Sequence, residues 1–140
     1  MHRDIIFRNI IEEDLRSIYL EGLNEPEFFD LPFAWNSEII AKLFASDGSI
    51  SFAAMKKKKL IGFIFGSIEN DRSYIHWIMV AEKFRKTGIG QELLRLFTEA
   101  SKERGIEKFL TSPVKNSHKI IEFFAKNGFS VKETYIEFYK

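Results

Sequence analysis

One stretch, Ile78 to Gln91, limits the fold of this chain more than any other part of the sequence. It begins with the apolar run Ile78–Val80, which is typical of a buried strand. After a short polar turn the apolar positions recur with helical spacing, from Leu93 to Phe97. Gly88 and Gly90 lie between the two patterns. The sequence therefore predicts a strand, a tight turn and a helix in direct succession, an arrangement typical of α/β folds.

The predicted turn has the chemistry of an anion site. At the start of a helix several backbone N–H groups have no internal partner, and the helix dipole is positive there. Gly88 and Gly90 remove side chains where a phosphate would have to touch the backbone, and Arg85 and Lys86 add positive charge beside it. The residues predict a cradle for a diphosphate, although the glycines could also serve only to cap the helix tightly.

Two familiar phosphate-binding motifs do not match this turn. A P-loop requires Gly-Lys followed by Ser or Thr, whereas Gly90 is followed by Gln91. A dinucleotide fingerprint requires a third glycine where this chain has Leu93, and a parallel βαβ unit near the start of a domain. The residues alone therefore indicate phosphate without naming the ligand.

The remaining pattern predicts one α/β domain, residues 1–140, with the element order βααβββαβαβ. The expected elements are a strand at 5–8, helices at 11–22 and 37–45, strands at 51–55, 60–68 and 73–80, a helix at 90–104, a strand at 108–112, a helix at 117–126 and a strand at 129–139. Gly105 is expected to end the helix 90–104 as a C-cap glycine. The segment 129–139 has no evident turn and forms one long strand or two very short ones.

Charge composition argues against a nucleic-acid partner. The 140 residues carry 21 basic and 20 acidic side chains, for a net charge of +1. Binding through phosphate neutralisation normally needs a clear basic excess or a basic stripe. The one basic run, Lys56–Lys59, lies between two apolar stretches. We interpret it as a solvated hairpin turn rather than as a patch for an acidic partner.

Other residue types exclude further classes. The chain has no cysteine, which rules out disulfides and thiolate chemistry. His2, His76 and His118 are too scattered for a spacing-based metal motif, so no metal is expected. Charges within Met1–Leu15 interrupt any signal-peptide core, and no apolar run reaches membrane-spanning length. We therefore expect a cytoplasmic protein with no membrane partner.

The run Arg85-Lys86-Thr87-Gly88-Ile89-Gly90 matches the signature R/Q-x-x-G-x-G/A of the GNAT (Gcn5-related N-acetyltransferase) superfamily. The chain resembles this family over nearly its whole length. Further similar segments are Phe7-Arg8 with Glu12–Asp14, the hairpin through Leu60–Phe63, and the helix ending Asn127-Gly128-Phe129. The resemblance implies a twisted mixed sheet, largely antiparallel and flanked by helices, with acetyl-CoA bound where the fourth and fifth strands part.

The same resemblance implies which residues bind the cofactor. The backbone of Ile78, Met79 and Val80 should run beside the pantetheine arm, and the amides of Lys86 to Gln91 should hold the pyrophosphate. The family commonly places an asparagine near the cofactor, which here is displaced to Asn116, with Ser117 following it. The full expected set is Ile78, Met79, Val80, Arg85, Lys86, Thr87, Gly88, Ile89, Gly90, Gln91, Asn116, Ser117 and Phe124.

The catalytic positions of the family are changed in this chain. Amine acetylation needs a base to take the amine proton and a donor for the departing thiolate. The usual tyrosine donor matches Phe124, and the two alternative glutamate bases match Tyr74 and Ser112. Tyr135 and Tyr139 are other possible donors.

His76 is then the candidate base. It shares strand parity with Tyr74 and should face the same side. Its intrinsic pKa suits proton transfer near neutrality, although a structural strand histidine fits the sequence equally well.

The resemblance implies N-acetyl transfer from acetyl-CoA to a primary amine of a small molecule or protein, by direct attack. The chain would act as a monomer or homodimer. The alternative is a non-catalytic acyl-CoA-binding domain with a sensing or regulatory role, which the altered catalytic positions suggest.

Overall fold

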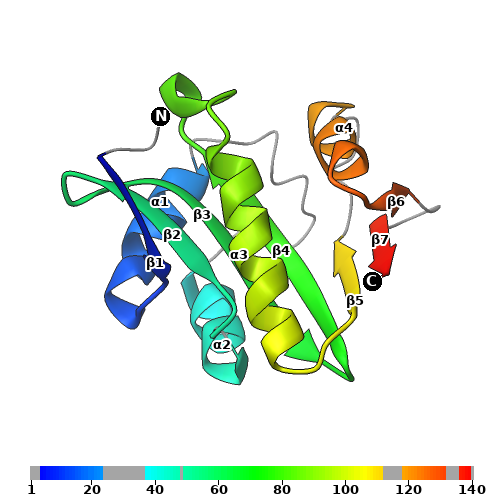
Figure 1. Ribbon diagram of the computed structural model, residues 1–140. Helices are drawn as coiled ribbons and strands as arrows, with labels where there is room; N and C mark the ends of the chain where they lie inside the picture. Colours follow the sequence, from blue (N-terminus) through cyan, green and yellow to red (C-terminus); the bar gives the residue numbers. More distant parts are fainter. Residues whose placement is uncertain (1–3, 24–36, 48, 112–117, 132–135, 140) are drawn as a thin grey trace.

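The computed structural model describes residues 4–23, 37–47, 49–111, 118–131 and 136–139, and its strands form one seven-stranded sheet (Figure 1). The strands are β1 (Ile5–Asn9), β2 (Phe52–Lys56), β3 (Lys59–Glu69), β4 (Arg72–Val80), β5 (Lys108–Thr111), β6 (Ser130–Val131) and β7 (Ile136–Tyr139). The helices are α1 (Leu15–Leu23), α2 (Ser37–Asp47), α3 (Ile89–Glu103) and α4 (His118–Lys126), with short 3-10 turns η1 (Glu12–Asp14) and η3 (Glu82–Phe84). Among these segments, no helix is both long and apolar enough to cross a lipid bilayer.

The spatial order of the strands is β1-β2-β3-β4-β5-β7-β6. Every neighbouring pair is antiparallel except β4 and β5, which are parallel. The mixed, mostly antiparallel sheet flanked by helices is therefore confirmed.

The predicted element order has one strand too few at its end. Of the two alternatives expected for residues 129–139, the structure has the second, two very short strands. Val131 of β6 pairs with Ile136 of β7, and Ser130 pairs with Glu137. Two segments that pair antiparallel with each other cannot be one continuous strand. β7 also lies between β5 and β6, which a single final strand would not require.

Helices cover both faces of the central strands, which explains why β3 is apolar along most of its length. Figure 1 shows α3 in front of the sheet and α1 and α2 behind it. Ile64 of β3 belongs to the cluster on the α3 side, and Phe63 and Phe65 belong to the cluster with Ile18 of α1 and Ile40 of α2. A strand buried on both faces loses the apolar–polar alternation of an exposed strand.

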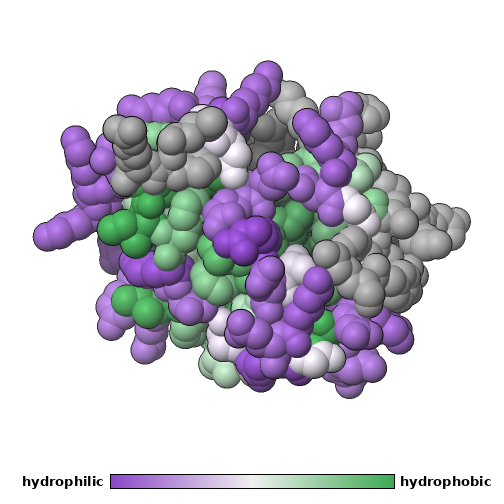
Figure 2. All heavy atoms as spheres, viewed as in Figure 1, coloured by the Kyte–Doolittle hydropathy of each residue, from purple (hydrophilic) through white to green (hydrophobic). Residues whose placement is uncertain are grey.

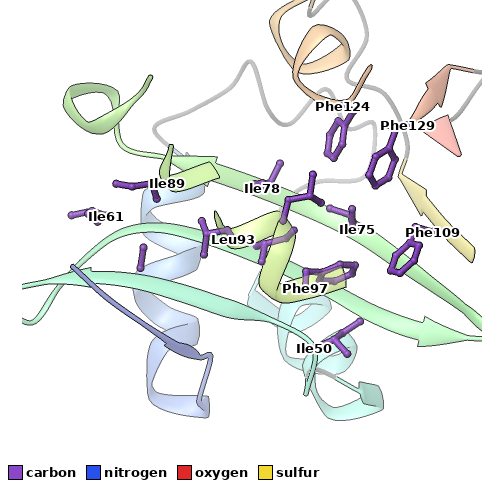
Figure 3. Packing of buried hydrophobic residues seen from close by; sticks show 13 residues of the cluster. Ile50, Ile61, Ile75, Ile78, Ile89, Leu93, Phe97, Phe109, Phe124 and Phe129 are labelled. Atoms are coloured by element: carbon purple, nitrogen blue, oxygen red, sulfur yellow. The ribbon is translucent and has the colours of Figure 1, made fainter. Parts of the chain in front are cut away.

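The α3-side cluster extends to α4 and β5. Figure 3 shows Leu93 and Phe97 of α3 over the sheet, with Phe124 and Phe129 farther along. The ring of Phe109 on β5 lies 6.3 Å from that of Phe97, centroid to centroid. These aromatic contacts connect the C-terminal elements to the main sheet.

A bulge interrupts the pairing of β3 with β4. Phe65 pairs with Trp77 and Gly66 pairs with Ile75, so His76 is an extra residue on β4. A Cβ on Gly66 would lie 2.3 Å from the carbonyl oxygen of Tyr74, which explains the glycine at this close approach. Buried Ser51 supports the same point, because its Oγ accepts from the Gly66 N–H at 2.9 Å and donates to the Gly66 carbonyl at 3.2 Å.

An ion pair joins β1 to the turn that follows it. Arg8 donates from Nη1 and Nη2 to the two carboxylate oxygens of Asp14, at 2.7 and 3.0 Å, and the Ile11 N–H donates to Asp14 Oδ2 at 2.8 Å. Burial opposes ionisation of Asp14, but the hydrogen bonds from Arg8 and Ile11 outweigh it and lower the pKa of Asp14 below its ordinary value. The pair thus fixes the entry into α1.

Candidate active site

The described part of β5 pairs with only the first half of β4. Their parallel register runs from Arg72↔Lys108 to Ile75↔Thr111, whereas β3 follows β4 as far as Val80. Figure 1 shows β4 continuing toward α3, whereas the described part of β5 ends at Thr111. Among the described residues, no strand pairs with the second half of β4 on the side away from β3, so an extended ligand could pair there as an added strand does. We call this segment the open half of β4.

The turn after β4 is folded onto its own backbone. The Ala81 N–H donates to the Ile61 carbonyl at 2.8 Å and continues the pairing with β3. Arg85 Nε donates to the Val80 carbonyl at 2.9 Å, and Thr87 Oγ1 donates to the Phe84 carbonyl. These bonds fix the position at which the backbone enters α3.

The N-terminus of α3 has no side-chain cap. Gly88 is the N-cap residue, with φ 90° and ψ 1°, and no side chain of the cap accepts a hydrogen bond from the first turn. The Gly88 carbonyl already accepts from the Glu92 N–H at 3.0 Å. Lys86 also has a left-handed φ of 63°. Successive amides in such a turn can converge on an anion, and the positive end of the helix dipole adds to the attraction.

The two signature glycines have different roles. Gly88 needs its backbone freedom, because its positive φ strains other residues. At Gly90 a Cβ would point toward the ring of Phe123 on α4 at 3.4 Å and toward Val80 Cγ2 at 3.7 Å. The space beside the Cα of Gly90 is thus lined by side chains, whereas the sequence interpretation gave both glycines to a phosphate.

The remaining predicted cofactor residues fall into three groups. The side chains of Ile78 and Met79 are buried on opposite faces of the sheet, so only their backbone could meet a ligand. Phe124 is 1% exposed and packs on Phe129 with ring centroids 5.0 Å apart, so its ring is part of the core. Asn116 and Ser117 lie outside the described residues, as do Ser112 and Tyr135, which the sequence analysis considered for catalysis.

His76 faces the same side as Tyr74, as its strand parity predicted. The two rings stack at a centroid distance of 6.4 Å and an interplanar angle of 13°. The bulge brings Trp77 to that side as well, with its ring centroid 5.6 Å from that of His76. Nε2 of His76 lies 2.8 Å from Oγ of Ser67.

The pKa argument for His76 is wrong in the folded protein. Burial lowers the pKa of His76 from 6.5 to about 4, because the charged imidazolium loses its hydration. The ring is therefore neutral at physiological pH, with a pKa well below the range that suits a general base. Its role in catalysis stays a prediction.

Ser67 is a site residue that sequence reasoning missed. It is 2% exposed and pairs with Tyr74 across the two strands. The signal was a single hydroxyl inside the apolar run of β3, but its link to His76 depends on the bulge. Tyr139, by contrast, pairs with Lys108, which pairs with Arg72 at the start of β4, so β7 places it far from Val80.

No metal cluster is seen in the described part of the chain. Within it, no group of three or more His, Cys, Asp or Glu side chains gathers as metal ligands would.

Comparison with solved structures shows the same fold in several acetyltransferases. The PaiA N-acetyltransferase of Thermoplasma acidophilum, in complex with coenzyme A, superposes with a TM-score of 0.83 at 18% identity, covering 97% of this chain and 99% of its own. Naa50 of Arabidopsis thaliana, with the bisubstrate analogue CoA-Ac-MVNAL, gives 0.79 at 18% identity, covering 96% and 97%. The ribosomal-protein-S18-alanine N-acetyltransferase of Escherichia coli gives 0.76 at 15% identity, covering 96% and 93%.

Sequence comparison gives the family. No curated protein matches the chain significantly. The model of the acetyltransferase (GNAT) family matches residues 9–129. These include the open half of β4, α3 and the turn between them, residues 81–88, which we call the glycine turn. The family match covers most of the chain and includes both the uncapped start of α3 and the open half of β4, in agreement with the fold. This chain therefore belongs to the GNAT acetyltransferase family.

Proposed function

We propose that this chain transfers an acetyl group from acetyl-CoA to a primary amine of a small molecule or protein. The observation that carries the proposal is the juxtaposition of the uncapped α3 N-terminus with the open half of β4. The N-terminus of α3 accommodates an anionic group and the open half of β4 an extended arm, as the diphosphate and the pantetheine arm of CoA require. Similar folds occur in the coenzyme A complex of PaiA and the bisubstrate complex of Naa50.

In this proposal the backbone of Ile78–Val80 binds the pantetheine arm. The amides from Lys86 to Gln91 hold the diphosphate. Arg85 bonds to the Val80 carbonyl, so it connects the two parts of the site through the main chain. We further propose a single cytoplasmic domain, residues 1–140, acting as a monomer or homodimer.

The chemistry is attack of a neutral amine nitrogen on the thioester carbonyl carbon. The new C–N bond forms, the C–S bond breaks, the amine gives up a proton, and the thiolate takes one. A lysine-like amine is mostly protonated at pH 7, and a base with a pKa of about 4 removes that proton poorly. The reaction should therefore use amine that is already neutral, and kcat/KM should keep rising above pH 7 toward the pKa of the acceptor.

The changed catalytic positions favour a second candidate, an acyl-CoA-binding domain without catalysis. Phe124 has no proton to donate and is buried, and His76 is a weak base. Such a domain would bind acyl-CoA and respond to it without turning it over.

Two glycines at opposite ends of α3 offer a matched test. Gly88 and Gly105 have φ of 90° and 80°, so alanine at either position strains the backbone similarly. A Cβ at Gly105 would meet nothing within 4 Å. We expect Gly88→Ala to weaken CoA binding in calorimetry by about tenfold or more, and Gly105→Ala to leave it unchanged.

The outcomes separate the two candidates. No heat of CoA binding to the wild-type protein would overturn the proposed site. CoA binding without amine-dependent release of free thiol, across a panel of polyamines, amino acids and peptides, would exclude the enzyme and support the binding domain.

A further inference from the structure

Two hairpins of this sheet have the same turn conformation but different residue types. The β3–β4 hairpin turns through Asn70 and Asp71, with φ of 50° and 62°. The β2–β3 hairpin turns through Lys57 and Lys58, with φ of 50° and 67°. Asn, Asp and Gly suit this left-handed geometry, whereas lysine is strained in it. The lysines are therefore present despite the turn geometry, which calls for another reason for their positions.

The lysine hairpin is joined to the glycine turn. Nζ of Lys56 lies over the ring of Phe84, 5.2 Å from its centroid. The pairing of Gly62 with Val80, and the bond from the Ala81 N–H to the Ile61 carbonyl, hold the root of the hairpin against the strand that leads into the turn. The hairpin lysines therefore lie at the same end of the sheet as the start of α3.

The glycine turn carries positive charge of its own. Lys83 and Lys86 are exposed there, and Arg85 lies between them. Lys86 is the third lysine of the described chain with a left-handed φ. Figure 2 shows hydrophilic side chains along this margin, from the hairpin at the left to the turn at the top.

Among the described residues, fewer acidic than basic side chains lie close in sequence to this margin. The acids close in sequence are Glu82, within the turn, and Asp4, which precedes Ile5, the partner of Lys56 in the sheet. The whole chain has a net charge of only +1, so the positive charge is concentrated here and offset elsewhere. A polyanion that approaches this end of the sheet therefore experiences a positive electrostatic potential, which the net charge of the chain alone would not predict.

We propose that the Lys57–Lys58 hairpin, together with the lysines of the β4–α3 turn, steers the phosphate groups of coenzyme A to the start of α3. This inference rests on the proposed function. It revises the expectation that the hairpin is only a solvated turn. Long-range attraction of this kind acts on the association rate and is screened by salt.

The test uses a variant that suits the turn better than the native residues. Lys57→Asn with Lys58→Gly removes two charges and supplies the preferred Asn-Gly turn, so its Tm should equal or exceed that of the wild type. The matched control, Lys42→Asn with Lys108→Asn, removes two exposed lysines from α2 and from the start of β5. Stopped-flow tryptophan fluorescence would measure association of CoA and of dephospho-CoA, which lacks one phosphate.

We expect the hairpin variant to bind CoA about two- to tenfold more slowly at an ionic strength of about 10 mM, and at the wild-type rate at about 0.5 M. Dephospho-CoA should show a smaller decrease, and the control variant none. Equal rates for the wild type and the hairpin variant at low salt would overturn the inference but would not contradict the proposed function, because CoA would still bind. An equal decrease in the control would also overturn it, because net charge would then explain the effect.

Discussion

Lowering the pH from 7 to 5 should destabilise this fold by about 2 kcal/mol through a single side chain, His76. Burial lowers the pKa of His76 from 6.5 to about 4 in the folded protein. Between these two values the unfolded chain binds a proton that the folded chain does not. The stabilisation is therefore complete above pH 6.5 and is lost as the pH falls toward 4, where the loss reaches about 3 kcal/mol.

The matched variant is His76→Gln. Glutamine can keep a hydrogen bond to Ser67 Oγ, the partner 2.8 Å from His76 Nε2, but it does not titrate in this range. The pKa of Asp14 is already below its ordinary value, so this carboxylate stays ionised above pH 5 in both states and does not contribute there. The difference between the two proteins therefore isolates His76.

Urea unfolding at pH 7, 6 and 5, followed by circular dichroism, gives the free energy of unfolding for both proteins. The wild type should lose about 2 kcal/mol more than His76→Gln between pH 7 and 5. Parallel losses in the two proteins would show that the imidazole titrates at its ordinary pKa, and both the burial argument and the proposed weak base would then be wrong.

Two further predictions concern stability. Gly66→Ala would place a Cβ 2.3 Å from the carbonyl oxygen of Tyr74 and 2.5 Å from the ring of Phe97, and should lower the free energy of unfolding by about 2–3 kcal/mol. Gly62→Ala, whose Cβ would lie 3.0 Å from the Met79 carbonyl oxygen, should lower it less. Equal melting temperatures of the two variants would contradict the bulge geometry. Asp14→Asn should lower the free energy of unfolding by about 1 kcal/mol at pH 7. This difference from the wild type should shrink as the pH falls below about 3.8, because Asp14 has a lowered pKa and the stabilisation by its ionised carboxylate is lost there. A difference that does not change with pH would show that the ion pair with Arg8 contributes nothing.

Local patterns predicted most of the architecture. The change from an apolar run to helical spacing located β4 and α3, and Gly105 ends α3 as expected, with φ 80° and its N–H bonded to the Lys102 carbonyl at 2.9 Å. The separation of β6 from β7 has no such signal, because residues 132–135 contain neither glycine nor proline.

The details of the candidate site depend on contacts between distant segments. The bulge at His76 arises where Gly66 on the neighbouring strand accepts the close approach of Phe97 from α3. The link from His76 to Ser67 and the lowered pKa of His76 both follow from this packing. Residue type gives the intrinsic pKa of a histidine, whereas its burial depends on tertiary packing. The sequence therefore predicted which face of the sheet His76 lies on but not its lowered pKa.

The short register between β4 and β5 divides the molecule into two parts of unequal cohesion. Among the described residues, four pairs, from Arg72↔Lys108 to Ile75↔Thr111, join the last strands to the larger half of the sheet, together with a few aromatic contacts. So short a register should open at lower free energy than the hairpin of β3 and β4, which pair from Gly62↔Val80 to Glu69↔Arg72. We therefore expect the last strands to open before the half of the sheet that leads into α3 does.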